Sequence, residues 1–339
     1  MLFRSFVYHR SIESRNLLDL LARCERHGLK ANLSLRPGTP LDFQWPQMGE
    51  IITRYRLAEM DNLFAYDLAW EPVFGGYEAR RRWDPQWAEW VIERYGSIES
   101  AEKDWGVPIS RAGGVPTGPS DQQVSTDGEW RVMVAAYRRF VDDLLSRAHL
   151  EAAQKIRSVD PHHLLSFRMN VAGDPTAGAA AMAYDFAALA KSVDIMEPEG
   201  YGRIGDLERV LPGAFTAAYA RLGAPTRPVM WAEFGNNVWD QARMTQDEGR
   251  LAFTAQFYRD FLTVAHHSQA NGTVSWFYPG GYRWNERSDF GLINPDGTWR
   301  EVTRVIHELA PQMTTERPEP GPIVEFRVDR DAEIGRAHV

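Results

Sequence analysis

Residues 65–72 read AYDLAWEP, an apolar stretch that ends on Glu71 with Pro72 directly after it. The run of apolar and aromatic residues is typical of a β-strand that is buried on both faces. A glutamate is costly to bury, and a turn residue would be a more ordinary end for such a strand. Because parallel α/β folds place their functional groups at the carboxyl ends of the strands, this ending predicts a functional site next to Glu71.

A helix followed by a strand recurs along the chain. Apolar residues at helical spacing precede the later strands, for example in residues 17–28, which Gly28 closes, and in residues 207–223. Thr245 and Glu248 have the spacing of a capping box for the last helix before the final strand. The strands are expected at residues 2–8, 29–35, 62–70, 162–170, 193–201, 228–235 and 272–281.

This alternation predicts an α/β fold, a (β/α)8 TIM barrel that lacks its first strand. The seven expected strands are one short of a closed barrel, and Met1 leads directly into the first of them, so we expect an N-terminal truncation. A doubly wound open sheet is the alternative, but no glycine-rich phosphate loop follows any of the strands.

The C-terminal part of the sequence has a different character. Residues 314–322, TTERPEPGP, are typical of a linker, and residues 323–328 alternate like a β-strand. The last seven residues, EIGRAHV, match the translation of a common sequencing adapter. The predicted organisation is a barrel domain over 1–312, a linker with the start of a possible β module over 313–332, and an artefact over 333–339.

The composition limits the classes of function. The net charge of -8 argues against a nucleic-acid binder, because phosphate binding needs clustered Lys and Arg. The single cysteine, Cys24, has the spacing of a helical core residue and has no second cysteine to pair with. No uninterrupted apolar run is long enough to span a membrane. An uncharged substrate is favoured, and the oligomeric state and the cellular location stay open.

Several predicted strands end on side chains that suit chemistry or hydrogen bonding. In addition to Glu71, they are Arg36, Arg168 with Asn170, Glu199 with Tyr201, Glu233, and Trp276 with Tyr278. Ordinary polarity at a strand end is a sufficient explanation for any one of these residues. The convergence of carboxylates and aromatic rings from several strands at one mouth of a barrel nevertheless predicts a site.

The segments around Glu71 and Glu233 resemble those of a known family. AYDLAWEP and PVMWAEFG are similar to the acid/base and nucleophile segments of clan A glycoside hydrolases, the retaining β-glycosidases on TIM barrels. SWFYPGG and RSDFGLINPDGTWREV are similar to the clan's last strand and following loop, and WAEWVIERYGSIESAEKDWG resembles a segment of families 42 and 5. The clan has Asn before the acid/base, where this chain has Trp70.

The resemblance implies that Glu71 is the acid/base and Glu233 the nucleophile of a retaining mechanism, with carboxyls about 5 to 5.5 Å apart. Apolar neighbours such as Trp70 and the charge of Glu233 would keep Glu71 protonated. Trp276 would stack on the apolar face of a pyranose. Outer aromatic candidates are Tyr278, Tyr282, Trp284 and Trp239.

The remaining candidates would bind the sugar or orient the glutamates. Tyr201 is placed to donate to Glu233, and Arg4, Arg168 and Asn170 are candidates for binding hydroxyls. Glu199 lies two residues before Tyr201 on the same strand face, so it could replace Glu71 as the acid or bind a hydroxyl. No metal or organic cofactor is expected. A carbohydrate is the expected ligand, and a non-catalytic carbohydrate-binding barrel is the alternative to an enzyme.

Overall fold

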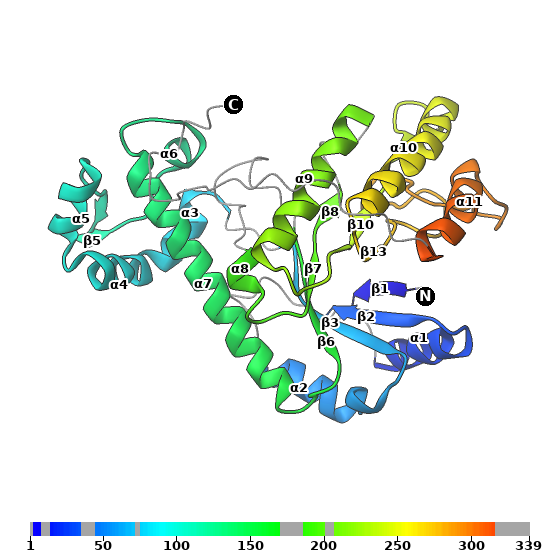
Figure 1. The fold of residues 1–339 in the computed structure, drawn as a ribbon, viewed down its shortest axis with the longest axis horizontal. Helices are drawn as coiled ribbons and strands as arrows, with labels where there is room; N and C mark the ends of the chain where they lie inside the picture. Colours follow the sequence, from blue (N-terminus) through cyan, green and yellow to red (C-terminus); the bar gives the residue numbers. More distant parts are fainter. Residues whose placement is uncertain are drawn as a thin grey trace.

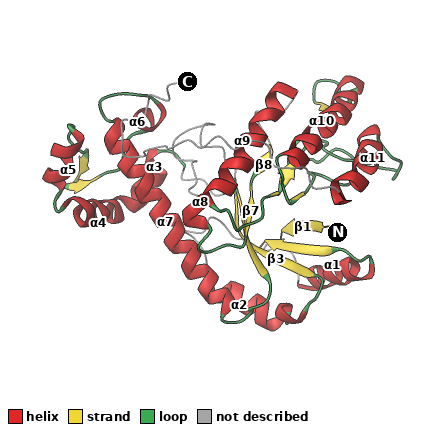
Figure 2. Ribbon diagram, in the orientation of Figure 1, coloured by secondary structure: helices red, strands yellow, loops and turns green. Residues whose placement is uncertain are grey.

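The computed structural model describes residues 3–7, 14–34, 45–71, 75–169, 186–200 and 207–315. Parallel strands form the centre of the molecule, and helices lie outside them (Figure 1 and Figure 2). A five-stranded parallel sheet has the order β1 (Phe3–Val7), β2 (Lys30–Ser34), β3 (Leu63–Trp70), β6 (Leu164–Arg168) and β7 (Ile195–Glu197). The predicted α/β fold with a parallel sheet is therefore confirmed.

Shorter ladders continue this sheet. A parallel bridge between Met196 and Val229 leads from β7 to β9 (Met230–Trp231), which pairs with β13 (Gly272–Thr273). β8 (Glu199–Gly200) pairs in parallel with β10 (Glu233–Phe234). Each of the seven predicted strands thus contains a described strand. Within the described residues, no ladder joins β13 to β1.

Helices connect the successive parallel strands. They are α1 (Ser14–Arg26), α2 (Trp45–Arg54), α7 (Arg131–Arg157), α8 (Phe186–Leu189), α9 (Leu207–Gly223) and α10 (Glu248–His267), and α11 (Glu301–Thr315) follows the last strand. A short 3-10 helix, η2 (Leu57–Glu59), follows α2. None of the helices in the described part of the chain has both the length and the apolarity needed to cross a bilayer.

A helical insertion follows β3 and extends away from the strands at the left of Figure 1. Its elements are α3 (Tyr77–Arg80), η3 (Arg81–Trp83), α4 (Asp84–Tyr95), α5 (Ile98–Trp105), the pair β4 (Arg111–Ala112) and β5 (Val115–Pro116), and α6 (Asp121–Ser125). Trp87 is fully buried there and stacks on Trp90 and Trp105, with ring centroids 5.5 and 5.8 Å away. Tyr137 of α7 meets Trp87 edge-on at 5.2 Å, which anchors the insertion to α7.

The hydrophobic core follows the predicted pattern, and Cys24 is buried in it at 2% exposure. The predicted capping box at Thr245 is wrong. α10 begins at Glu248, and Asp247 caps it by accepting the Arg250 N–H at 2.9 Å. Thr245 instead pairs with Asp240 in the antiparallel hairpin of β11 (Trp239–Asp240) and β12 (Thr245–Gln246). Residues 313–315, the first of the predicted linker, form the end of α11. The rest of the predicted linker, the β module and the adapter-like end lie outside the described residues.

Candidate active site

β8 and β10 bring two of the predicted site glutamates side by side. Glu199 and Glu233 are direct partners in the parallel ladder, so both side chains lie on the same side of it. The exposed fraction is 0% for Glu199 and 5% for Glu233. Two neighbouring carboxyls that are this well buried must be compensated by protons, cations or hydrogen-bond donors.

Arg168, at the end of β6, supplies the cation. Its Nη1 donates to Glu233 Oε1 at 2.6 Å, and its Nε lies 3.4 Å from Asp67 Oδ2. The Arg168 side chain is only 1% exposed. Burial alone would lower the pKa of Arg168, but the charges of Asp67 and Glu233 raise it overall. A charge-assisted hydrogen bond from such a guanidinium favours an ionised carboxylate as its acceptor.

Glu71 follows β3 in a backbone conformation that is unusual for glutamate. β3 contains a bulge, because Asp67 lies opposite Ser166 while Trp70 lies opposite Arg168. Glu71 then has a positive φ of 43°, and its N–H donates to the Arg168 carbonyl at 3.1 Å. Such strained residues cost on the order of 1–3 kcal/mol and cluster at functional sites. The half-buried Glu71 side chain is thus fixed at the predicted edge of the sheet.

Glu199 links the two predicted catalytic residues. It is the ladder partner of Glu233, and neither of its carboxyl oxygens has a hydrogen-bond partner among the described residues. Burial raises the pKa of Glu199 well above the ordinary glutamate value, and the charges of Glu233 and Glu71 raise it further. The structure therefore brings the predicted acid/base, the predicted nucleophile and the rival carboxylate together in one buried cluster.

Two further buried carboxyls belong to this cluster but were not predicted. Glu197 Oε1 accepts a hydrogen bond from Asn32 Nδ2 at 2.6 Å, and burial raises its pKa to about 8, helped by the charge of Asp67. Burial also raises the pKa of Asp67 to about 6, although Arg168 opposes this shift. The two-residue period of a strand would have found Glu197 from Glu199. It could not have related Asp67 to Glu71, because the β3 bulge breaks this period between Asp67 and Trp70.

Trp276 follows β13 and is partly buried. The Arg283 guanidinium lies over its ring, 4.6 Å from the ring centroid, and the Trp276 indole N–H donates to Glu286 Oε2 at 3.4 Å. The Trp276–Phe277 peptide bond is cis. Arg283 therefore covers one face of the indole. Among the outer aromatic candidates, Trp284 is 81% and Tyr278 50% exposed, and Trp239 and Tyr282 contact one another at 4.8 Å.

The other predicted residues stay predictions. Tyr201 and Asn170 lie outside the described residues. Arg4 and Trp70 are placed only as backbone positions in β1 and β3. Within the described part of the chain, no group of three or more His, Cys, Asp or Glu side chains is arranged to hold a metal ion.

This arrangement of parallel strands wrapped by helices is similar to the fold of TIM-barrel glycosidase domains. The structure is similar to the β-galactosidase from Bacillus circulans sp. alkalophilus, with a TM-score of 0.69 at 14% identity over 93% of this chain and 52% of that chain. It is also similar to a GH42 β-galactosidase from G. stearothermophilus, with a TM-score of 0.63 at 12% identity over 92% and 51% of the two chains. An agarase matches with a TM-score of 0.62 at 12% identity over 88% and 46%.

The predicted similarity to clan A glycoside hydrolases is thus confirmed at the level of the fold. The chain spans about half the length of the solved structures it matches. No protein-family model and no curated protein matches the sequence. At this level of identity, the likeness concerns architecture, and the chemistry has to be argued from the residues of this chain.

Proposed function

We propose that this chain is a retaining glycoside hydrolase that cleaves a β-linked glycan, with Glu233 as nucleophile and Glu71 as acid/base. The observation that carries the proposal is that both glutamates lie near the buried Glu199: Glu233 is its ladder partner, and, in addition to burial, the charges of Glu233 and Glu71 raise the pKa of Glu199. Two carboxyls in different environments are what glycosidic cleavage requires. Glu233 is bound to Arg168, whereas Glu71 is half-buried at the open end of β3.

The two residues would act in two displacements. Glu233 attacks the anomeric carbon while Glu71 protonates the departing oxygen, which gives a glycosyl ester of Glu233. Glu71 then takes a proton from a water molecule as the water oxygen attacks the same carbon and releases Glu233. Trp276 would stack on the apolar face of the sugar. The matched β-galactosidases and agarase make β-galactosides the first substrates to test.

The test uses two aryl β-D-galactosides, 4-nitrophenyl and phenyl. Wild type is expected to hydrolyse both, and Glu233→Gln to lose at least about a thousandfold in kcat/KM, because the attacking carboxylate is gone. Glu71→Ala should reduce hydrolysis of phenyl galactoside about 10²–10⁴-fold and of the activated 4-nitrophenyl galactoside far less. Glu93→Gln, at an exposed position of α4, is the matched control and should behave like wild type.

The alternative outcomes are distinct. Sugar binding without hydrolysis on a wider panel of β-glycosides would contradict the enzyme and support a carbohydrate-binding barrel. Equal losses on both substrates in Glu71→Ala would remove the acid role from Glu71. An inverted product anomer, seen by proton NMR, would contradict the retaining mechanism.

A further inference from the structure

Three aromatic side chains form a surface beside the acidic cluster, and we call these rings the aromatic surface. Trp239 belongs to β11, and Tyr282 and Trp284 belong to the segment after β13. The rings of Trp239 and Tyr282 are 4.8 Å apart, and those of Tyr282 and Trp284 meet edge-on at 6.2 Å. Trp284 is 81% exposed, the highest value among the large apolar side chains of the described ranges. Apolar groups that gather at one exposed place, unlike single ones, mark a binding surface.

Hydrogen bonds between the two loops fix the backbone beneath these rings. The Val238 N–H donates to the Asp289 carbonyl at 2.8 Å, and the Asp289 N–H donates to Asn237 Oδ1 at 2.9 Å. Trp284 lies in a turn over residues 283–288, whose ends form an antiparallel bridge. The rings are therefore held in place before a ligand arrives, and binding loses little free energy in ordering them.

The aromatic surface is made of other side chains than the candidate active site. Its two loops follow β10 and β13, so it belongs to the same carboxyl edge as the acidic cluster. Arg283 stands between Tyr282 and Trp284 in the sequence. Its guanidinium lies over the Trp276 ring, 4.6 Å from the ring centroid, whereas the two rings on either side of it contact one another. Arg283 thus stands between the aromatic surface and Trp276.

The size of the aromatic surface suits a small ligand better than a protein. Three fully exposed aromatic side chains present about 450–750 Å². Trp239 and Tyr282 are half-buried, so the exposed area of the rings is smaller than this. A stable protein interface needs about 800 Å² on each partner. The rings alone therefore do not provide the area of a protein interface.

The polar groups around the rings favour an uncharged ligand that carries hydroxyls. Residues 239–247 and 282–288 together have three acidic and three basic side chains, so their charges cancel. Arg283, for example, pairs with Glu286 at 2.8 Å. Asn285, the residue after the exposed tryptophan, is itself exposed and has an amide that both donates and accepts hydrogen bonds. A pyranose matches this combination, because its C–H face stacks on a ring while its hydroxyls bind amides.

We propose that the aromatic surface is a secondary carbohydrate-binding site, which binds a neutral β-linked oligosaccharide outside the acidic cluster. Binding there does not require that the chain is an enzyme. If the proposed function holds, a glycan chain bound at both places would be retained more strongly than at either one, because the second contact becomes intramolecular.

The first test follows the Trp284 indole N–H by NMR in ¹⁵N-labelled protein during titration with β-1,4-galactotetraose and, separately, with cellotetraose. The resonance is assigned through its loss in Trp284→Phe. We expect it to move and to saturate at millimolar sugar, as is usual for a small exposed site. The indole of Trp299, which is 51% exposed before α11, should not move. A Trp284 resonance that stays in place up to about 10 mM of both sugars would overturn the proposal.

The second test is affinity electrophoresis in native gels that contain soluble β-1,4-galactan. Trp284→Ala should weaken binding about fivefold or more, and Trp284→Phe, which keeps a ring, should weaken it less. Trp299→Ala is the matched control and should migrate like wild type. Because the Trp284 side chain is 81% exposed, its variants should keep the wild-type melting temperature. Equal retardation of wild type and Trp284→Ala would contradict the proposal.

Other outcomes separate this site from its rivals. A dimer seen by sedimentation, lost in Trp284→Ala and accompanied by no response to sugar, would assign the rings to contact between two copies and overturn the proposal. Hydrolysis of aryl galactosides without a sugar response at Trp284 would keep the glycosidase and refute the secondary site. A response at Trp284 in a chain that hydrolyses none of the glycosides would support the secondary site and contradict the enzyme.

Discussion

At the scale of single residues, the candidate site is defined by buried carboxyls that outnumber their donors. Arg168 binds Glu233 and lies near Asp67, and Asn32 donates to Glu197. Several oxygens of the cluster, among them Glu197 Oε2 and Asp67 Oδ2, have no hydrogen-bond partner among the described residues. Carboxyls in this state hold protons near neutral pH, which ties the stability of the protein to pH.

Glu197 makes this link measurable. Its pKa is about 8 in the folded protein against an ordinary value of 4.5, with burial as the main cause. Between these two values the folded state holds a proton that the unfolded chain has lost, so the contribution of Glu197 to stability is largest below pH 4.5 and falls as the pH rises to about 8. One such group contributes a slope of about 1.4 kcal/mol per pH unit.

The change to test is Glu197→Gln, which keeps an oxygen for Asn32 and cannot ionise. Urea unfolding between pH 5 and 8 should show a flatter dependence for the variant, so that its stability relative to wild type rises with pH. Glu93→Gln, at an exposed position, should follow the wild-type curve at every pH. If the wild-type and Glu197→Gln curves stay parallel over this range, Glu197 is ionised in the folded protein and the prediction is wrong.

At the scale of elements, the strands could be predicted because their apolar runs alternate regularly with amphipathic helices. Glu71, Glu199 and Glu233 were predicted at one edge of the sheet because each stands at the carboxyl end of a predicted parallel strand. The β3 bulge and the positive φ of Glu71 could not be predicted, because both depend on the pairing with β6. The stacking of the Arg283 guanidinium on the Trp276 ring could not be predicted either, because it depends on how the loops pack and not on a periodic sequence pattern.

The contact between β10 and the segment after β13 depends on Gly235. A Cβ atom at this residue would lie 2.2 Å from the Trp276 carbonyl oxygen, and Trp276 N–H donates to the Phe234 carbonyl at 2.9 Å. Gly235→Ala must separate the two segments, so we expect a loss of about 1–3 kcal/mol in the free energy of unfolding. The same shift should lower kcat/KM on the aryl galactosides, because Glu233 and Trp276 lie on the two segments.

Gly213→Ala is the matched control for this substitution. Gly213 lies in α9, where an added Cβ would meet the Trp231 ring at an ordinary distance of 3.4 Å. Alanine favours a helix over glycine by about 0.5–1 kcal/mol, so this variant should be as stable as wild type or more stable. Equal behaviour of the two alanine variants would contradict the role given to Gly235.

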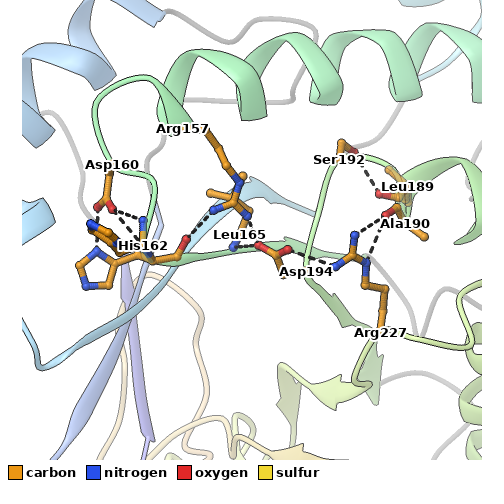
Figure 3. A network of polar contacts seen from close by, with 10 residues as sticks. Arg157, Asp160, His162, Leu165, Leu189, Ala190, Ser192, Asp194 and Arg227 are labelled. Carbon is orange, nitrogen blue, oxygen red and sulfur yellow. Dashed lines mark hydrogen bonds and ion pairs between the residues drawn. The ribbon is translucent and has the colours of Figure 1, made fainter.

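At the scale of the whole molecule, the two edges of the sheet have different kinds of polar groups. The carboxyl edge holds the acidic cluster, in which several oxygens have no hydrogen-bond partner among the described residues. At the amino edge, each acid is well matched (Figure 3). Asp160 accepts from the Tyr66 hydroxyl at 2.7 Å and from the backbone N–H groups of His162 and His163. In TIM barrels, the carboxyl edge of the strands carries the functional groups, and the amino edge stabilises the fold.

Asp194 allows this division to be tested. It precedes β7, accepts the Leu165 N–H at 2.9 Å and the Arg227 Nη1 at 3.2 Å, and pairs with Arg157 (Figure 3). Asp194→Asn would place an amide between two guanidinium groups in a site where the acid is only 18% exposed, so urea unfolding should show a loss of about 1–3 kcal/mol.

The control is Asp19→Asn, which removes the ion pair between Asp19, 56% exposed, and Arg23, 63% exposed. Because this pair is exposed, its loss should lower the free energy of unfolding by less than about 1 kcal/mol. Asp194 lies at the edge opposite to the glutamates, so its loss should lower the free energy of unfolding. The alkaline limb of the pH profile of kcat/KM for phenyl β-D-galactoside should stay where it is in wild type. A limb that moved with Asp194→Asn would mean that the amino edge is coupled to the carboxyls of the candidate site. The division between a stabilising and a functional edge would then not hold for this molecule.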